Sequence, residues 1–193
     1  MVGSTLTPGN PQVNGYRYDQ LNRIVGMNTY TGLDNTTNIF TVPVNASVNY
    51  KERVIYDANG NILTYTRNGH TANTAGVNMD DLTYSYYAGT NKLKKVSDAI
   101  APSNYADDID DQAENENYEY DEIGNLIKDK AEGITNINWN VYGKISSITK
   151  FKNNVTTNIA YTYDASGNRI SEDVNGAKTF YVRDASGNVM SLY

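Results

Sequence analysis

The residues best suited to chemistry form one acidic stretch, Asp107-Asp108-Ile109-Asp110-Asp111. Its carboxylates could bind a divalent cation, or supply the paired acid and base of a hydrolase. Both roles need a rigid frame, and no strand pattern surrounds this stretch to provide one. We therefore interpret it as a solvated loop. A hydrolase built here is the alternative, and its activity would disappear when Asp108 and Asp110 become Asn.

The other usual signals of catalysis are weak or missing from the sequence. The single histidine, His70, lies in the turn-like segment Asn68-Gly69-His70-Thr71, and no Ser/Asp constellation can be tied to it. No glycine-rich phosphate loop or Gly-x-Ser-x-Gly turn occurs. There is no cysteine, which excludes disulfides, thiol catalysis and Cys-ligated zinc. The sequence predicts no catalytic residue, no cofactor and no metal site, so we expect that the chain is not an enzyme.

Composition narrows the class further. The 193 residues carry a formal charge of −6 without a Lys/Arg cluster, which argues against nucleic-acid or anionic-membrane partners. No apolar run approaches the roughly 18 residues of a membrane span, and residues 1–12 do not resemble a signal peptide. Any export signal would lie outside this chain. The 17 tyrosines against three phenylalanines and one tryptophan, together with abundant Asn and Gly, favour strands joined by turns. The composition predicts an all-β chain.

A repeated pattern of about ten residues organises this β chain. Its clearest copies are Tyr16–Ile24, Val54–Leu63, Tyr118–Ile127 and Tyr161–Ile170, and its looser copies are Tyr84–Leu93, Ile137–Ile145 and Tyr181–Val189. The copy at Tyr84–Leu93 lacks the aspartate of the others and carries one extra turn residue. Seven copies in one frame indicate a repeat architecture.

Each copy predicts a β-hairpin. Two aromatic residues two positions apart lie on one face of a strand, and the Asp that follows can close a turn by accepting backbone N–H groups. The third residue after the Asp is Gly or Asn, the types suited to a left-handed backbone. A type I turn followed by such a residue forms a hairpin loop with a bulge. The turns are predicted at Gln20–Arg23, Ala58–Asn61, Glu122–Asn125, Val141–Lys144, Ala165–Asn168 and Ala185–Asn188.

The repeated residues have a structural interpretation and a binding alternative. The turn aspartates could be calcium ligands, but the glycine of a calcium-binding loop is misplaced in the copy that contains Asp57 and Gly60. The tyrosines could bind sugars through their ring faces, but a packing ladder also explains why Trp139 replaces one of them. We assign the structural role to Tyr16, Tyr18, Asp19, Tyr56, Asp57, Gly60, Tyr84, Tyr86, Tyr118, Tyr120, Asp121, Gly124, Trp139, Gly143, Tyr161, Tyr163, Asp164, Gly167, Tyr181, Asp184 and Gly187.

The spacing of the copies predicts how the hairpins are joined. The last copies recur every 19 to 24 residues, which leaves no room for a crossover helix. Longer intervals upstream predict insertions near residues 26–50, 68–80 and 97–117, the last as an exposed or disordered excursion. We expect a single array over residues 1–193, in which hairpins contact mainly their neighbours in a coiling antiparallel strip. The unpaired strands at its two edges predict edge-to-edge self-association, or curling that brings the first and last hairpins together.

The pattern Tyr-x-Tyr-Asp-x-x-Gly-Asn-x-Ile at this spacing resembles the YD repeat of bacterial RHS (rearrangement hotspot) proteins, over about residues 14–193. That group includes the C components of insecticidal toxin complexes, polymorphic RHS toxins and the animal teneurins. The resemblance implies a hollow spiral β-shell around a C-terminal toxin domain, and in teneurins a similar shell that serves adhesion. The chain is too short to close a shell and lacks the self-cleavage motif and the toxin domain. We therefore expect a shell fragment from the late part of a longer protein.

The resemblance implies a non-catalytic structural module of a secreted or cell-surface RHS-repeat protein, which encloses or presents a partner polypeptide such as a C-terminal toxin domain. Its implied partners are the remainder of its own shell and the enclosed domain. The alternative is an adhesive binding module that recognises glycan or protein on the cell surface. Sequence beyond residue 193 would distinguish them, because a toxin-like domain favours the shell and an anchoring tail favours the adhesin.

Overall fold

Antiparallel strands account for the regular structure of the chain. The computed structural model describes residues 12–34, 36–37, 39–40, 47–70, 76–105, 108–109 and 111–193, and these residues form sixteen strands and no helix. The strands are β1 (Gln12–Tyr18), β2 (Ile24–Thr31), β3 (Leu33–Asp34), β4 (Ile39–Phe40), β5 (Ser47–Tyr56), β6 (Ile62–Asn68), β7 (Asn78–Tyr86), β8 (Leu93–Asp98), β9 (Tyr118–Tyr120), β10 (Leu126–Asp129), β11 (Ile134–Trp139), β12 (Ile145–Lys152), β13 (Val155–Tyr163), β14 (Arg169–Val174), β15 (Ala177–Arg183) and β16 (Val189–Leu192). The predicted all-β class is confirmed.

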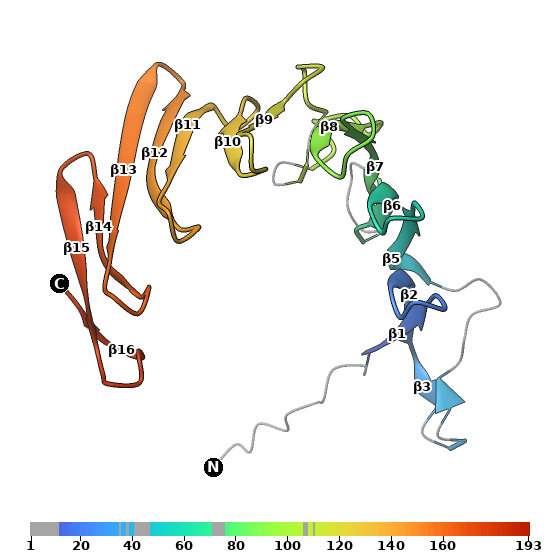
Figure 1. The fold of residues 1–193 in the computed structure, drawn as a ribbon. Coiled ribbons are helices and arrows are strands. Elements are labelled where there is room, and N and C mark those ends of the chain that lie inside the picture. The colour runs from blue at the N-terminus through green and yellow to red at the C-terminus, as the bar shows by residue number, and fades with distance from the viewer. Residues whose placement is uncertain are drawn as a thin grey trace, which may run out of the picture. The chain divides into compact units, whose positions relative to one another are not determined.

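Two sheets contain most of these strands, and in both the strand order follows the chain. One sheet has the order β1-β2-β5-β6-β7-β8, the other runs from β9 to β16, and β3 pairs with β4 in a small ribbon (Figure 1). By their contacts the residues divide into two compact units, Met1–Ser85 with Val96–Asp111, and Tyr86–Lys95 with Gln112–Tyr193. Consecutive strands are neighbours because short turns join them, as the repeat spacing predicts.

The predicted bulge lies at the same position in five hairpins. The pairing register shifts just before the turn, between Ile55 and Tyr56 in one hairpin and between Thr162 and Tyr163 in another. Equivalent shifts occur at Arg17/Tyr18, Asn138/Trp139 and Val182/Arg183. A bulge adds one residue to one strand and redirects its side chain. In these hairpins the extra, unpaired residue lies in the returning strand, as Leu63 does opposite Tyr56 and Ile170 does opposite Tyr163.

The turn residues adopt the left-handed backbone that the sequence predicts. The third residue after the turn Asp or Asn has a positive φ in six hairpins: Asn22 (59°), Gly60 (91°), Gly124 (97°), Gly143 (69°), Gly167 (80°) and Gly187 (87°). In the Tyr84–Leu93 copy, the amide of Tyr87 donates to the carbonyl of Lys92, five residues on, where the other turns span four. The extra turn residue predicted there is confirmed.

The ranges predicted as insertions differ in structure. The range 26–50 contains the end of β2, the β3–β4 ribbon and the start of β5, and its residues 35, 38 and 41–46 lie outside the described residues. In the range 68–80, β7 already begins at Asn78, and residues 71–75 are not described. The range 97–117 is predicted to be an exposed or disordered excursion. That prediction is wrong at Gln112 and Asn117, which are buried. Asn117 accepts the amide of Ala131 and donates to Asp129, which explains its burial.

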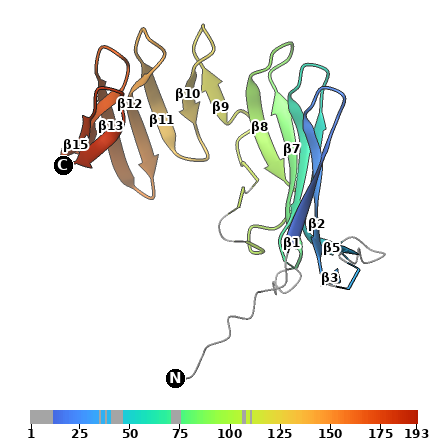
Figure 2. The same ribbon diagram turned by 90° about the horizontal axis from the view of Figure 1, so that it is seen from below.

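The hydrophobic core is thin in both units. The buried apolar side chains among the described residues are Met27, Leu82 and Val96 in the first unit and Ile137 in the second. Within each unit, no other described sheet or helix covers a face of the main sheet (Figures 1 and 2). Hydrogen-bonded strands and side-chain contacts along the strip therefore contribute much of the order. In the part of the chain that the structure describes, there is no helix long and apolar enough to cross a membrane.

Candidate functional site

The turn aspartates are engaged by donors of their own turns. In the hairpin of Asp57, Oδ1 accepts the amides of Asn59 at 2.9 Å and Asn61 at 2.8 Å, and Oδ2 accepts the Asn61 side-chain amide at 2.8 Å. Asp121, Asp164 and Asp184 make the same three bonds with the residues two and four positions on. This is the turn-closing role that the spacing predicts. The asparagine after the glycine supplies the third donor, which explains the Gly-Asn pair of the repeat.

The aromatic residue before the turn joins each hairpin to the preceding one. In four hairpins its polar atom donates to the backbone carbonyl of the first residue of the preceding returning strand: Tyr56 to Ile24 at 2.9 Å, Tyr120 to Leu93 at 3.0 Å, Trp139 to Leu126 at 2.8 Å and Tyr163 to Ile145 at 2.7 Å. The acceptor occupies the same place in each hairpin. The repeat therefore encodes a side-chain bond between hairpins as well as a turn.

Sequence reasoning missed one member of this series. In the last hairpin Arg183 stands where the others have an aromatic residue, and its Nε donates to the carbonyl of Arg169, the first residue of β14, at 3.1 Å. The same guanidinium donates to Gly187 at 2.7 Å within its own turn. The signal in the sequence is its position directly before Asp184, which matches the position of the aromatic residues in the other hairpins. We call Tyr56, Tyr120, Trp139, Tyr163 and Arg183 the hairpin-joining residues.

Cationic side chains stack on the tyrosines of the repeat. The guanidinium of Arg169 lies 5.1 Å from the ring centroid of Tyr161 and 4.8 Å from that of Tyr181, and Arg23 lies 4.6 Å from the ring centroid of Tyr56. Cation–π contacts of this kind stabilise neighbouring strands. The ring faces involved contact protein groups, as in a structural ladder.

Other signature tyrosines occupy different environments. Tyr16 and Tyr18 in β1 are more than half exposed. The hydroxyl of Tyr118 accepts the side-chain amide of Gln112 at 2.8 Å, and the hydroxyl of Tyr181 donates to Glu172 at 3.3 Å. The tyrosines of the repeat therefore differ in exposure, and those of the first strand lie at the surface.

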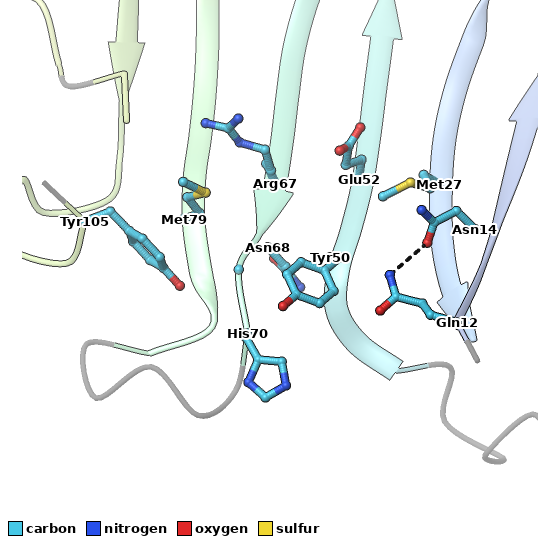
Figure 3. Close-up of a pocket in the computed structure, with 11 residues that line it drawn as sticks. Gln12, Asn14, Met27, Tyr50, Glu52, Arg67, Asn68, His70, Met79 and Tyr105 are labelled. Atoms are coloured by element: carbon cyan, nitrogen blue, oxygen red, sulfur yellow. Dashed lines mark hydrogen bonds between the residues drawn. The ribbon is translucent and has the colours of Figure 1, made fainter. Parts of the chain in front are cut away.

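A hollow of about 610 Å³ opens in the first unit (Figure 3). Aromatic side chains of Tyr50, His70 and Tyr105 and charged groups of Glu52 and Arg67 contribute to its lining. His70, in the segment that the sequence indicates to be turn-like, is exposed, and its ring centroid lies 5.8 Å from that of Tyr50. No repeat position supplies these residues, so the pattern could not predict the hollow.

The backbone of Tyr50 and the side chain of Tyr105 shape this hollow. Tyr50 has a φ of 56°, a left-handed conformation that is uncommon for an aromatic residue, and its ring remains 41% exposed. Tyr105 donates from its hydroxyl to the carbonyl of Gly76 at 2.9 Å, and its ring covers Gly69, where any side chain would overlap it. The segment after β8 therefore returns over this end of the sheet and forms part of the hollow.

The acidic stretch is only partly described. Asp107 and Asp110 lie outside the described residues, and Asp111 is exposed. Asp108 is half-buried, and one of its carboxylate oxygens lies within 4.8 Å of one from Asp80 and one from Asp98. Asp108 is thus not simply a residue of a solvated loop, because the fold brings it to two other carboxylates.

Comparison with known proteins identifies the fold. No family model and no curated protein matches the chain. The crystal structure of TcdB2-TccC3-TEV matches with a TM-score of 0.55 and 13% identity, over 93% of this chain and 9% of that one. A structure of the Photorhabdus luminescens Tc holotoxin pore with a mutated TccC3 matches with a TM-score of 0.56 and 14% identity, over 95% of this chain and 9% of that one. The chain therefore shares an all-β fold with a short part of these toxin-complex chains.

Proposed function

We propose that the chain is a non-catalytic structural module of an RHS-type shell, which encloses or presents a partner polypeptide such as a toxin domain. The hairpin-joining residues are the observation that carries this proposal. They direct a repeated side chain to a backbone carbonyl of the preceding hairpin, so the repeat builds and extends a sheet. A repeat used in this way supports a wall rather than a reaction centre.

The fold comparison supports the same proposal. The YD-like pattern resembles RHS proteins, and the solved structures that share the fold are toxin-complex chains of far greater length. On this proposal the chain forms one short segment of such a wall, with the rest of its shell and the enclosed polypeptide as partners. The protein that contains it would be secreted or carried on the cell surface. The proposal assigns no catalytic activity to the chain.

Limited proteolysis of the complete gene product, as its own cells make it, tests the enclosing role. A polypeptide held inside a wall is inaccessible to trypsin until the wall unfolds. We expect peptides from that polypeptide to appear only after the protein is denatured, while exposed turns of this chain are cut in the native state. If every segment outside this chain is digested as fast before denaturation as after it, the proposal is contradicted. Mass spectrometry of the time course separates the two results.

A second candidate function is an adhesive module that binds glycan, and the hollow in Figure 3 is the observation that favours it. Exposed aromatic rings beside amide and charged groups are typical of sugar sites, and Tyr50 keeps its ring exposed despite a strained backbone. A glycan array followed by titration of the best ligand tests this function. Tyr50→Ala should abolish the binding, and Tyr142→Ala, a change at an exposed turn tyrosine, should preserve it. Absence of any glycan signal would contradict it.

A further inference from the structure

In the first unit, the buried carboxylate of Asp80 has a hydrogen-bond donor at only one of its two oxygens. Asp80, in β7, has a fully buried side chain, and its Oδ2 accepts a hydrogen bond of 2.5 Å from Nε of Arg67 in β6. The other oxygen, Oδ1, is buried too, and no donor among the described residues reaches it. A buried carboxylate oxygen without a partner is costly. The unpartnered Oδ1 of Asp80 therefore indicates that a ligand binds at this point.

Two further carboxylates converge on Asp80 from different segments. Asp98 ends β8, and Asp108 lies in the segment that follows it. One carboxylate oxygen from each of the three residues lies within 4.8 Å of the others. Oδ2 of Asp80 is held by Arg67, which leaves Oδ1 of Asp80 as the oxygen without a donor among the described residues. Calcium binds oxygen at about 2.3–2.6 Å, so ligands of one ion lie within roughly 5 Å of each other. The three oxygens meet that condition.

The arrangement of Asp98 is already fixed by the backbone. Its Oδ1 accepts the amides of Asp81 at 2.8 Å and Ile100 at 3.1 Å. These bonds orient the carboxylate at the point where β8 ends and the following segment begins. Ligands held by second contacts of this kind are pre-organised for an ion.

The charge around the three carboxylates favours a cation. Among the described residues, Arg67 alone forms an ion pair with Asp80. Arg53, on the same sheet, directs its guanidinium to the carbonyl of Met27 and to Asn28. Three carboxylates in one cluster favour a cation, and Lys51 and Arg53, which line a hollow beside Asp80, form no ion pair with it among the described residues.

We propose that Asp80, Asp98 and Asp108 bind one calcium ion. Calcium accepts six to eight oxygen ligands in irregular geometry, which suits three carboxylates from separate segments, with carbonyls or waters completing the shell. Magnesium demands near-octahedral geometry and keeps most of its waters, so it suits this set less well. The ion would tie the segment after β8 to β7. That segment carries Tyr105, so calcium would also order one wall of the hollow.

Isothermal titration of the calcium-depleted full chain with calcium chloride tests the site. The wild-type chain should bind one ion saturably, and its thermal midpoint should rise with calcium. Asp108→Asn and Asp98→Asn should each weaken binding roughly tenfold or more, because each removes one ligand charge. Asp98→Asn keeps an oxygen that can accept the amides of Asp81 and Ile100. Neither variant leaves the charge of Arg67 unpaired, as replacement of Asp80 would.

Asp81→Asn is the matched control, since it removes the same charge from an exposed position next to Asp80 in the same strand. It should bind calcium as the wild-type chain does. The proposal is overturned if the wild-type chain binds no calcium, if Asp108→Asn and Asp98→Asn bind it as tightly as the wild type, or if Asp81→Asn loses binding equally. Binding of magnesium as tight as that of calcium would overturn the assignment to calcium.

Discussion

The hydroxyl of Tyr163 donates a hydrogen bond of 2.7 Å to the backbone carbonyl of Ile145, the first residue of β12. Tyr163 lies at the register shift of its own hairpin, where it pairs with Arg169. The extra residue of this bulge, Ile170, lies in the returning strand β14, and the hydroxyl of Tyr163 reaches the first residue of the returning strand of the preceding hairpin. The residue that joins the hairpins therefore directly precedes the aspartate that closes the turn, here Tyr163 before Asp164.

Replacing Tyr163 with Phe should destabilise the second unit. The change removes one hydrogen bond and leaves the Ile145 carbonyl without that donor, so the free energy of unfolding should fall by about 0.5–1.5 kcal/mol. Urea denaturation followed by circular dichroism measures the change. Tyr142→Phe removes a hydroxyl from a ring that is 84% exposed and should have no effect. Equal losses in the two variants would show that the Tyr163 bond contributes nothing specific.

Gly124 tests the turn conformation. Its φ is 97°, and a Cβ there would meet only ordinary contact with Lys92 at 3.6 Å, so the cost of a side chain comes from the backbone. Gly124→Val should lower the free energy of unfolding by about 1–2 kcal/mol. Gly124→Asn should lower it less, because asparagine tolerates left-handed backbone. A neutral valine variant would refute the turn type.

Most of the fold follows from local sequence, because each hairpin is determined within about ten residues. Asp57, Gly60 and Asn61 close their turn through bonds to one another, so their types and spacing were sufficient. The hydrogen bond from Tyr56 to the preceding hairpin could not be predicted from residue types and spacing alone. The spacing places its ring on one strand face, but its bond to Ile24 also depends on the pairing of β5 with β2 of the preceding hairpin.

The cluster of Asp80, Asp98 and Asp108 was even less predictable from the sequence. Asp80 and Asp108 are 28 positions apart and share no pattern with the repeat. They meet because the segment after β8 returns over the sheet, and that return depends on long-range contacts such as the one between Tyr105 and Gly76. A stretch of acidic residues with no strand pattern gives no sign of such contacts. The prediction of a solvated loop failed at Asp108 for this reason.

The turn aspartates predict the acid sensitivity of the fold. The side-chain hydrogen bond from the asparagine four residues on is the main cause that holds the pKa values of Asp57, Asp164 and Asp184 below the usual 3.8. The unfolded chain therefore takes up protons at higher pH than the folded chain. Their stabilising contribution is complete above about pH 3.8 and is lost as the pH falls through the lower folded values.

Urea midpoints measured across this pH range test that sign. The midpoint should hold steady from about pH 7 to 5 and decline below about pH 4. Asp164→Asn should start from a lower midpoint and lose less on acidification, because one of the titrating turn groups is gone. A midpoint that rises as the pH falls through this range would contradict the assignment.

The end strand β16 predicts self-association. It is the last strand of the eight-stranded sheet, and Met190 and Leu192 are 68% and 58% exposed. An apolar edge strand pairs readily with another edge. The apparent mass from light scattering should rise across a tenfold concentration series, and Met190→Lys should reduce that rise. A monomer at every concentration, with fast amide exchange in β16, would show an unprotected edge that does not associate.

The central claim is that the repeated aromatic residues hold hairpins together instead of facing a ligand, and Trp139 offers the most direct measurement. It is the only tryptophan, so its indole N–H gives one resonance in a ¹H–¹⁵N spectrum of the chain. That N–H donates to the carbonyl of Leu126 at 2.8 Å. The account predicts that it exchanges with solvent as slowly as the amides of β11. Exchange as fast as that of a free indole would show that the ring is not fastened to the preceding hairpin, and would contradict the account.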